Sequence, residues 1–92
     1  MTNYVNFDTP SEKGMIANVF YSNGYGASIE RNDQPDLEDL TKKYSLGFLK
    51  QQDYHTWGCI VDEKIETISL ESNLYNLTEE QLDNYLTQIQ AL

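Results

Sequence analysis

The chain has 92 residues, of which fifteen are acidic and six are basic, so its formal net charge is −9. This length fits one domain with a modest core, and seven Tyr, three Phe and one Trp argue against a disordered chain. The charge disfavours direct binding of nucleic acid, because phosphates repel an acidic surface. No apolar run reaches about 20 residues, so we expect no membrane span.

The N-terminal residues and the cysteine content predict a cytoplasmic protein. Residues 1–14 lack the basic patch and apolar stretch of a signal peptide. Cys59 is the single cysteine, which excludes an internal disulfide and fits a reducing compartment. We expect residues 1–92 to form one domain that begins with an irregular segment over 1–14, in which Val5 and Phe7 could form a short edge strand.

Residues 15–31 predict a β-hairpin, because Asn23-Gly24 between two apolar runs is typical of a two-residue type I′ turn. This turn would place Phe20 opposite Ala27. The core face would then carry Ile16, Phe20, Tyr25, Ala27 and Ile29, and the other face would keep Val19 and Tyr21 as apolar residues available for self-association. A bulge at Gly26 would shift this register.

The middle of the chain predicts a second hairpin. Residues 44–50 alternate Tyr44, Leu46 and Phe48 with smaller residues, and residues 56–62 carry Trp57, Cys59 and Val61 on one face. We expect Cys59 to be buried as a small hydrophobe. Residues 32–43 form a connector in which Pro35-Asp36 could start a short helix, and residues 65–70 fit either a short strand or an irregular approach to the final helix.

The sequence from Leu77 to Leu92 predicts an amphipathic helix. Thr78 and Gln81 fit a capping box, and Leu77 and Leu82 fit a hydrophobic staple. An apolar stripe follows at helical spacing, formed by Leu82, Tyr85, Leu86 and Ile89. We therefore expect an α+β fold, with a small antiparallel β-sheet built from two hairpins and covered on one face by this C-terminal helix.

The residue types that carry catalysis and metal binding are sparse. His55 and Cys59 on one strand would lie about 13 Å apart, too far for a nucleophile–base pair. One His and one Cys cannot build a zinc centre, the acids of residues 33–39 lack the calcium-loop spacing, and no phosphate-binding glycine motif occurs. We predict no enzyme activity, no catalytic residue, no cofactor and no metal.

Acidic residues are concentrated late in the chain. Residues 51–92 hold eight acids against one base, Lys64, and the segment from Ile65 to Leu92 has no cation. Acidity alone often serves solubility, but carboxylates can also stand in for DNA phosphates. Nine charges match about 15 Å of duplex, and a dimer would match about one turn. The predicted phosphate-mimicking, partner-binding carboxylates are Asp33, Asp36, Glu38, Asp39, Glu66, Glu71, Glu79, Glu80 and Asp83.

Several segments resemble small acidic proteins of T-even-type bacteriophages. They are VFYSNGYGASIERND, YSLGFLK, HTWGCIVDE and NLTEEQLDNYLTQI, within residues 15–92. In length, charge and order of elements the chain is similar to the anti-restriction nuclease proteins of these phages. The resemblance implies a phage-encoded homodimer that mimics DNA, acts in the host cytoplasm and blocks a restriction endonuclease specific for modified cytosine. It implies no particular functional residue.

Two other functions remain open. An immunity- or antitoxin-type protein would neutralise a basic enzyme through aromatic anchors such as Tyr54, Trp57 or Tyr75. A small enzyme would have to use Cys59 and His55.

Overall fold

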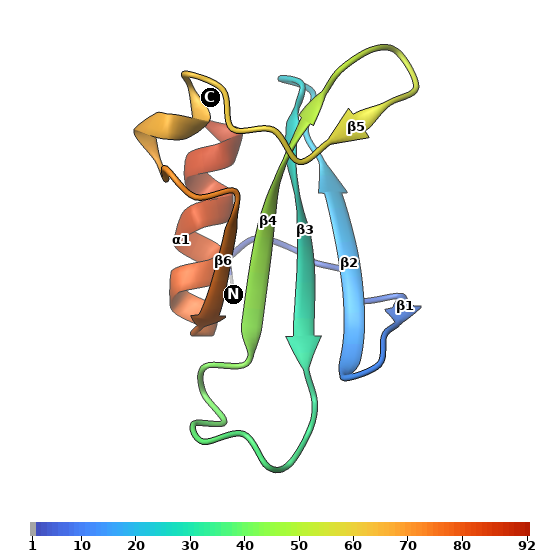
Figure 1. The fold of residues 1–92 in the computed structure, drawn as a ribbon, viewed down its shortest axis with the longest axis vertical. Helices are drawn as coiled ribbons and strands as arrows, with labels where there is room; N and C mark the ends of the chain where they lie inside the picture. Colours follow the sequence, from blue (N-terminus) through green and yellow to red (C-terminus); the bar gives the residue numbers. More distant parts are fainter. Residues whose placement is uncertain (1) are drawn as a thin grey trace.

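The computed structural model describes residues 2–92 and has the expected α+β fold (Figure 1). Its elements are β1 (Thr9–Pro10), β2 (Gly14–Phe20), β3 (Tyr25–Asn32), β4 (Tyr44–Gln51), β5 (Trp57–Gly58), the 3₁₀ helix η1 (Ile65–Thr67), β6 (Asn73–Leu77) and α1 (Glu79–Gln90). All strand pairs are antiparallel, in the order β1-β2-β3-β4-β5, with β6 paired to β4. Within residues 2–92, no helix has the length and apolar character needed to cross a lipid bilayer.

Helix α1 begins and packs as its sequence predicts. Thr78 Oγ1 accepts from the Gln81 N–H at 3.1 Å, and Gln81 Oε1 accepts from the Thr78 N–H at 2.9 Å, which completes the capping box. Leu77 is buried, and so are three residues of the apolar stripe, namely Leu82, Leu86 and Ile89. They join the alternate residues of β3 and β4 that face the helix, and this cluster forms the core.

The first hairpin is present, but its predicted register is wrong by one residue. Val19, not Phe20, lies opposite Ala27. The Tyr21 N–H donates to the Tyr25 carbonyl at 2.8 Å, which closes a three-residue loop. In this turn only Gly24 has a positive φ, +86°, as in a type I turn followed by a G1 bulge.

The one-residue slip exchanges the two faces of β2, because side chains alternate along a strand. Ala17 is buried, and Val19 and Tyr21 pack against the core. Phe20, predicted in the core, is 55% exposed. The predicted core face of β3 is correct, since Tyr25, Ala27 and Ile29 are all buried.

The second hairpin is shorter than predicted. Only Trp57 and Gly58 pair with β4, and Cys59, predicted to be buried, is exposed. Gly58 interrupts the apolar pattern, and the chain leaves the sheet after it. Pro35 and Asp36 form a turn, not the start of a helix. Strand β6, which the sequence did not predict, pairs Leu74 with Leu46 and Leu77 with Tyr44.

Residues 2–8, which we call the N-terminal strap, cross the same side of the sheet as α1. Val5 and Phe7 pack against the core, but the edge strand predicted for them is formed instead by Thr9 and Pro10. The Phe7 ring lies 6.1 Å from the Tyr44 ring and 4.9 Å from the guanidinium of Arg31. Helix and strap together therefore cover one face of the sheet.

The turn of the first hairpin also caps the end of α1. Asn23 Nδ2 donates to the carbonyls of Ile89 and Gln90, at 2.9 and 3.2 Å. The last turn of α1 has no basic residue, so this amide satisfies carbonyls that a helix otherwise leaves without partners. Asn23 Oδ1 accepts from the Tyr25 N–H at 3.0 Å, so one side chain serves both the turn and the helix.

Candidate acidic interaction surface

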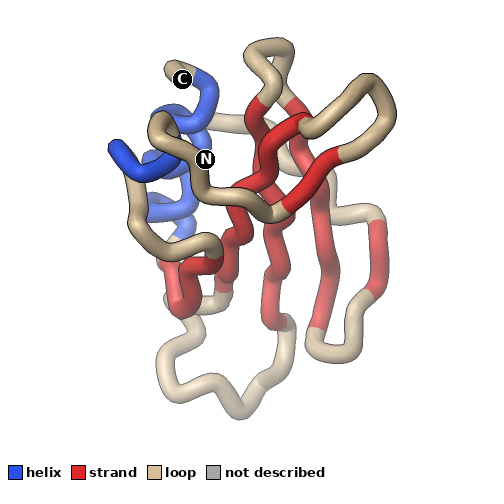
Figure 2. Tube along the Cα trace, turned by 45° about the horizontal axis from the view of Figure 1, so that its top comes forward, coloured by secondary structure: helices blue, strands red, loops and turns tan. Residues whose placement is uncertain are grey.

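The cation-free segment of the sequence forms one side of the molecule. η1, β6 and α1 lie together beside β4, as Figures 1 and 2 show. We call the surface of residues 65–92 the acidic side. Five of the predicted partner-binding carboxylates belong to it: Glu66, Glu71, Glu79, Glu80 and Asp83.

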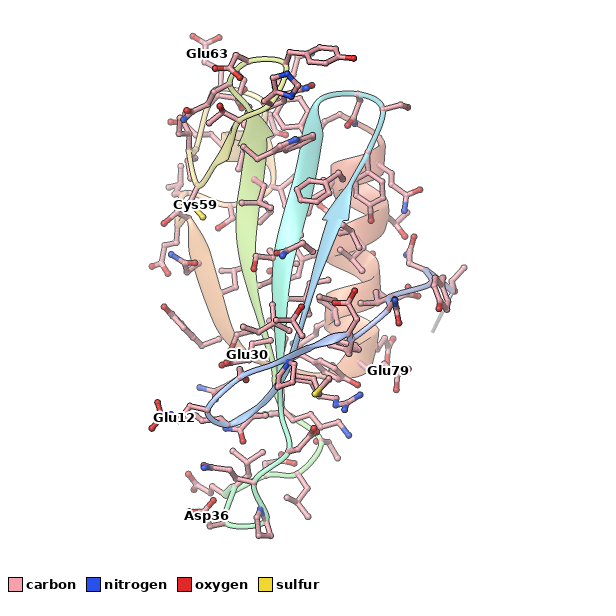
Figure 3. The ribbon with its side chains drawn as sticks, turned by 90° about the vertical axis from the view of Figure 1, so that its right-hand side faces the viewer. Glu12, Glu30, Asp36, Cys59, Glu63 and Glu79 are labelled. Carbon is pink, nitrogen blue, oxygen red and sulfur yellow. The ribbon has the colours of Figure 1, made fainter. Side chains whose placement is uncertain are left out.

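The other four predicted carboxylates lie in the loop between β3 and β4, close to the start of α1. Tyr44, the first residue of β4 after this loop, pairs with Leu77, the last residue of β6 before the N-cap of α1. Asn76 and residues 37–42 line one hollow of about 750 Å³. The pKa of Tyr44 is raised by burial and by the negative charge of Glu79. In Figure 3, Asp36 and Glu79 lie toward the same end of the molecule.

The same loop brings cations close to the acidic side. Lys42 and Lys43 are part of it, and they line one hollow together with Tyr75 and Asn76 of the acidic side. Residues 65–92 themselves have no cation. The surface around Tyr75 and Asn76, however, lies next to Lys42 and Lys43 of the β3–β4 loop.

Two loop carboxylates already have partners within the chain. Asp33 accepts from Arg31 Nε at 2.8 Å and from Nη2 at 3.0 Å, and the Arg31 hydrogen bonds lower its pKa. Asp39 accepts from the Thr41 hydroxyl at 2.6 Å and from the Thr41 N–H at 2.9 Å, which lowers its pKa in the same way.

Asp83 anchors the N-terminal strap. Its carboxylate accepts from the N–H groups of Asn3, at 2.7 Å, and Thr2, at 3.0 Å, and from Asn3 Nδ2 at 2.7 Å. The backbone N–H of Asn3 contributes most to lowering the pKa of Asp83, which falls to about 2. Its lone pairs are thus largely used within the chain.

The remaining six predicted carboxylates are exposed: Asp36, Glu38, Glu66, Glu71, Glu79 and Glu80. Glu79, Glu80, Asp83 and Thr2 also line an open hollow of about 570 Å³ at the start of α1. An exposed carboxylate is accessible to the Lys and Arg side chains of a partner.

One carboxylate that the sequence reasoning did not single out has a structural role. Asp62 accepts from Tyr25 Oη at 2.6 Å, Lys50 Nζ at 2.8 Å, the Ile65 N–H at 2.9 Å and the Lys64 N–H at 3.1 Å. Desolvation raises the pKa of Asp62, but the hydrogen bonds from Lys50, Tyr25 and Ile65 lower it further, so the net pKa lies well below its usual value. Asp62 precedes Lys64 by two residues and Ile65 by three. An Asp whose side chain accepts from backbone N–H groups shortly after it is the sequence signal for this role.

The residues considered for catalysis lie on different parts of the second hairpin. The His55 ring packs edge-on against the Tyr54 ring, 4.7 Å away, in the loop after β4. Cys59 Sγ lies above the sheet, 3.9 Å from the place that a Cβ on Gly47 would occupy. In residues 2–92 no three His, Cys, Asp or Glu side chains form a group that could hold a metal ion.

The proposed aromatic anchors differ in exposure. Tyr54 is 86% exposed and Tyr75 is 68% exposed, while Trp57 is partly buried with its ring 4.7 Å from the Phe20 ring.

No protein-family model, curated protein or solved structure matches this chain.

Proposed function

We propose that this protein is a phage-encoded DNA-mimic inhibitor. It binds the DNA-binding surface of a host modification-dependent restriction endonuclease, in the host cytoplasm and as a homodimer, and so blocks cleavage of phage DNA. The observation that carries the proposal is the acidic side, where η1, β6 and α1 gather a 28-residue segment without one cation. The likeness of the quoted segments to phage anti-restriction nuclease proteins supports the choice of target.

The size of the molecule supports mimicry of one face of a duplex. The longest extent is 38 Å, which one DNA strand spans with about 11 phosphates at 3.4 Å each. The net charge of −9 is close to that number. The whole duplex would carry about 22 charges over this length, so the protein matches one strand better than both.

Inhibition would be competitive. Lys and Arg side chains that otherwise contact phosphates pair with the exposed carboxylates, and the encounter is accelerated by opposite charge. We expect the exposed carboxylates other than Glu79 to matter more than Asp33, Asp39 and Asp83, because these three already accept hydrogen bonds within the chain.

The direct test adds the purified protein to an endonuclease that cleaves DNA containing modified cytosine. We expect cleavage to stop, binding to weaken steeply with salt, and duplex DNA to compete for the same surface. Simultaneous binding of DNA and inhibitor to the nuclease would refute the mimicry. A panel of unrelated DNA-binding proteins separates specific from generic inhibition.

A pair of matched variants tests the surface. Glu71→Gln with Glu80→Gln removes two exposed charges from the acidic side, and Asp8→Asn with Glu12→Gln removes two exposed charges elsewhere. We expect the first pair to weaken inhibition clearly more than the second. Equal effects would show that only total charge matters.

A specific aromatic-anchored inhibitor of a basic enzyme is the second candidate function. The high exposure of Tyr54 favours it, since a tyrosine that is 86% exposed can bury a large area in a partner. Under this alternative Tyr54→Ala reduces inhibition more than the Glu71/Glu80 pair does. Under DNA mimicry the order is reversed.

A further inference from the structure

The face of the sheet opposite α1 is uncovered. Cross-strand partners share a face, and Ala17, Ile29 and Leu46 mark the covered one. The alternate residues mark the other, which we call the open face. Its larger side chains are Ile16, Phe20, Glu30, Leu49, Trp57 and Tyr75, and Cys59 lies beside them. In Figure 3, Cys59 lies on the side of the sheet away from α1.

The open face is nearly free of charge. Of the strand residues on it, only Glu30 is charged, although the chain carries fifteen acids and six bases. Two molecules of net charge −9 repel each other least when they approach through such a surface. This distribution favours a second copy of the same chain as the occupant.

The open face has a ridge and a trough. Phe20, 55% exposed, and Trp57 form the ridge, with their rings 4.7 Å apart. The trough is a hollow of about 200 Å³ whose floor includes Ser28 and Gly47. A Cβ on Gly47 would lie 2.9 Å from Asn73 Oδ1, so a larger residue there would fill the trough.

The available area is sufficient for a weak or moderate dimer. Strands β2 to β4 have seven or eight residues, which gives a length of about 25 Å at 3.3 Å per residue. Four strand positions span about 19 Å across. Two such faces would bury roughly 1,000 Å², the lower bound for a specific interface.

We propose that two copies of this chain pair through their open faces. A two-fold axis that runs parallel to the sheets, midway between the two facing surfaces, places the Phe20–Trp57 ridge of each copy over the trough of the other, so one contact occurs twice. Helix α1 of each copy, with Glu79, Glu80 and Asp83, then lies on the outer side of the pair. This inference identifies the interface of the homodimer in the proposed function. It rests on that function only in giving the dimer a role, because association of the chain can be measured without any nuclease.

The test measures mass against protein concentration by analytical ultracentrifugation. We expect a monomer of 10.6 kDa to convert into a dimer. Phe20→Glu should raise the dimer dissociation constant about 30-fold or more, as expected for a central aromatic residue. Leu70→Glu is the matched control: Leu70 is 82% exposed, lies outside the strands and gains the same charge, so its dimer should persist.

Cys59 gives a second readout on the unaltered chain. Its maleimide labelling should slow at concentrations where the dimer forms, which keeps the inference testable even if Phe20→Glu does not fold. A wild-type chain that stays monomeric at millimolar concentration, or a Phe20→Glu variant that associates as wild type does, overturns the inference. Protection of Cys59 by the nuclease alone would assign the open face to the nuclease and overturn it too.

The two proposals fail in different ways. A monomer that still inhibits the nuclease refutes the open-face dimer and the homodimeric state, and leaves the inhibition of the nuclease in place. A dimer of the expected kind that inhibits no nuclease refutes the proposed function and leaves the interface in place.

Discussion

Asp62→Asn tests whether one carboxylate joins the sheet to η1. The substitution keeps the shape of the side chain but replaces one carboxylate oxygen with an NH₂ group, which cannot accept a hydrogen bond. The oxygen lost is either Oδ2, which accepts from Lys50 and Tyr25, or Oδ1, which accepts from the Ile65 N–H. The side chain of Asp62 is 19% exposed and that of Lys50 is 39% exposed, so solvent reduces the loss. We therefore expect a loss of about 2 kcal/mol, which is less than the roughly 3 kcal/mol at the low end for two hydrogen bonds to a charged group.

This loss predicts a measurable change in melting temperature. For a domain of this size it corresponds to a fall of about 8–16 °C at pH 7. Thermal unfolding followed by circular dichroism measures it. Asp36→Asn is the control, because it removes one exposed charge and should change the free energy of unfolding by less than about 0.5 kcal/mol.

The pH dependence gives the sharper test. The pKa of Asp62 is lower in the folded protein than in the unfolded chain, so its contribution is complete above the unfolded value of about 3.9 and is lost as pH falls below it. The difference between wild type and Asp62→Asn should therefore be full at pH 7 and narrow below about pH 4. An equal melting temperature at pH 7, or a difference that does not narrow in acid, would refute this role of Asp62.

Three further changes test contacts described above. Thr78→Ala should cost about 1 kcal/mol through loss of the helix cap, measured by urea unfolding, while Thr78→Ser should cost little. Asn23→Asp preserves a good turn residue, yet it should destabilise by about 1–2 kcal/mol, because it loses the donor to the Ile89 carbonyl and adds a negative charge at the C-terminus of α1; unchanged stability would contradict the cap. Asp83→Asn should release the strap, seen as faster amide exchange at Asn3, and wild type should keep that protection until pH nears 2, the pKa of Asp83.

Local signals gave the correct helix and the correct face of β3. The capping box of Thr78 and Gln81 depends on residues three apart, so the sequence alone contains all of its parts. The face of β3 is also local, because Tyr25, Ala27 and Ile29 alternate without interruption. Such features need no knowledge of what packs against them.

The register of β2 depended on a choice that the sequence left open. Asn-Gly supports a two-residue turn, but a three-residue loop with Gly24 at the left-handed position is also stable. Asn23 gains hydrogen bonds to the end of α1 in the observed loop. That contact spans 66 residues, so no local pattern could indicate it.

The candidate site was predicted in part. The sequence showed that residues 65–92 lack cations, and the fold gathers them on one side. It did not show that Lys42 and Lys43 come near that side, nor that Asp83 is used by the strap, since both follow from long-range packing. β6 was missed because only Leu74 and Leu77 of its five residues face the core.

The anchoring of the strap has a consequence for how the chain can be rearranged. Asn3 hydrogen-bonds to Thr87 and to Gln90, so residues near the two ends of the described chain touch. A short linker could join them at a small entropic cost, and new ends could be opened in the exposed β3–β4 loop, where no strand would be cut. Such a circular permutant should keep every strand pair, and it would free the loop carboxylates to move independently of the acidic side.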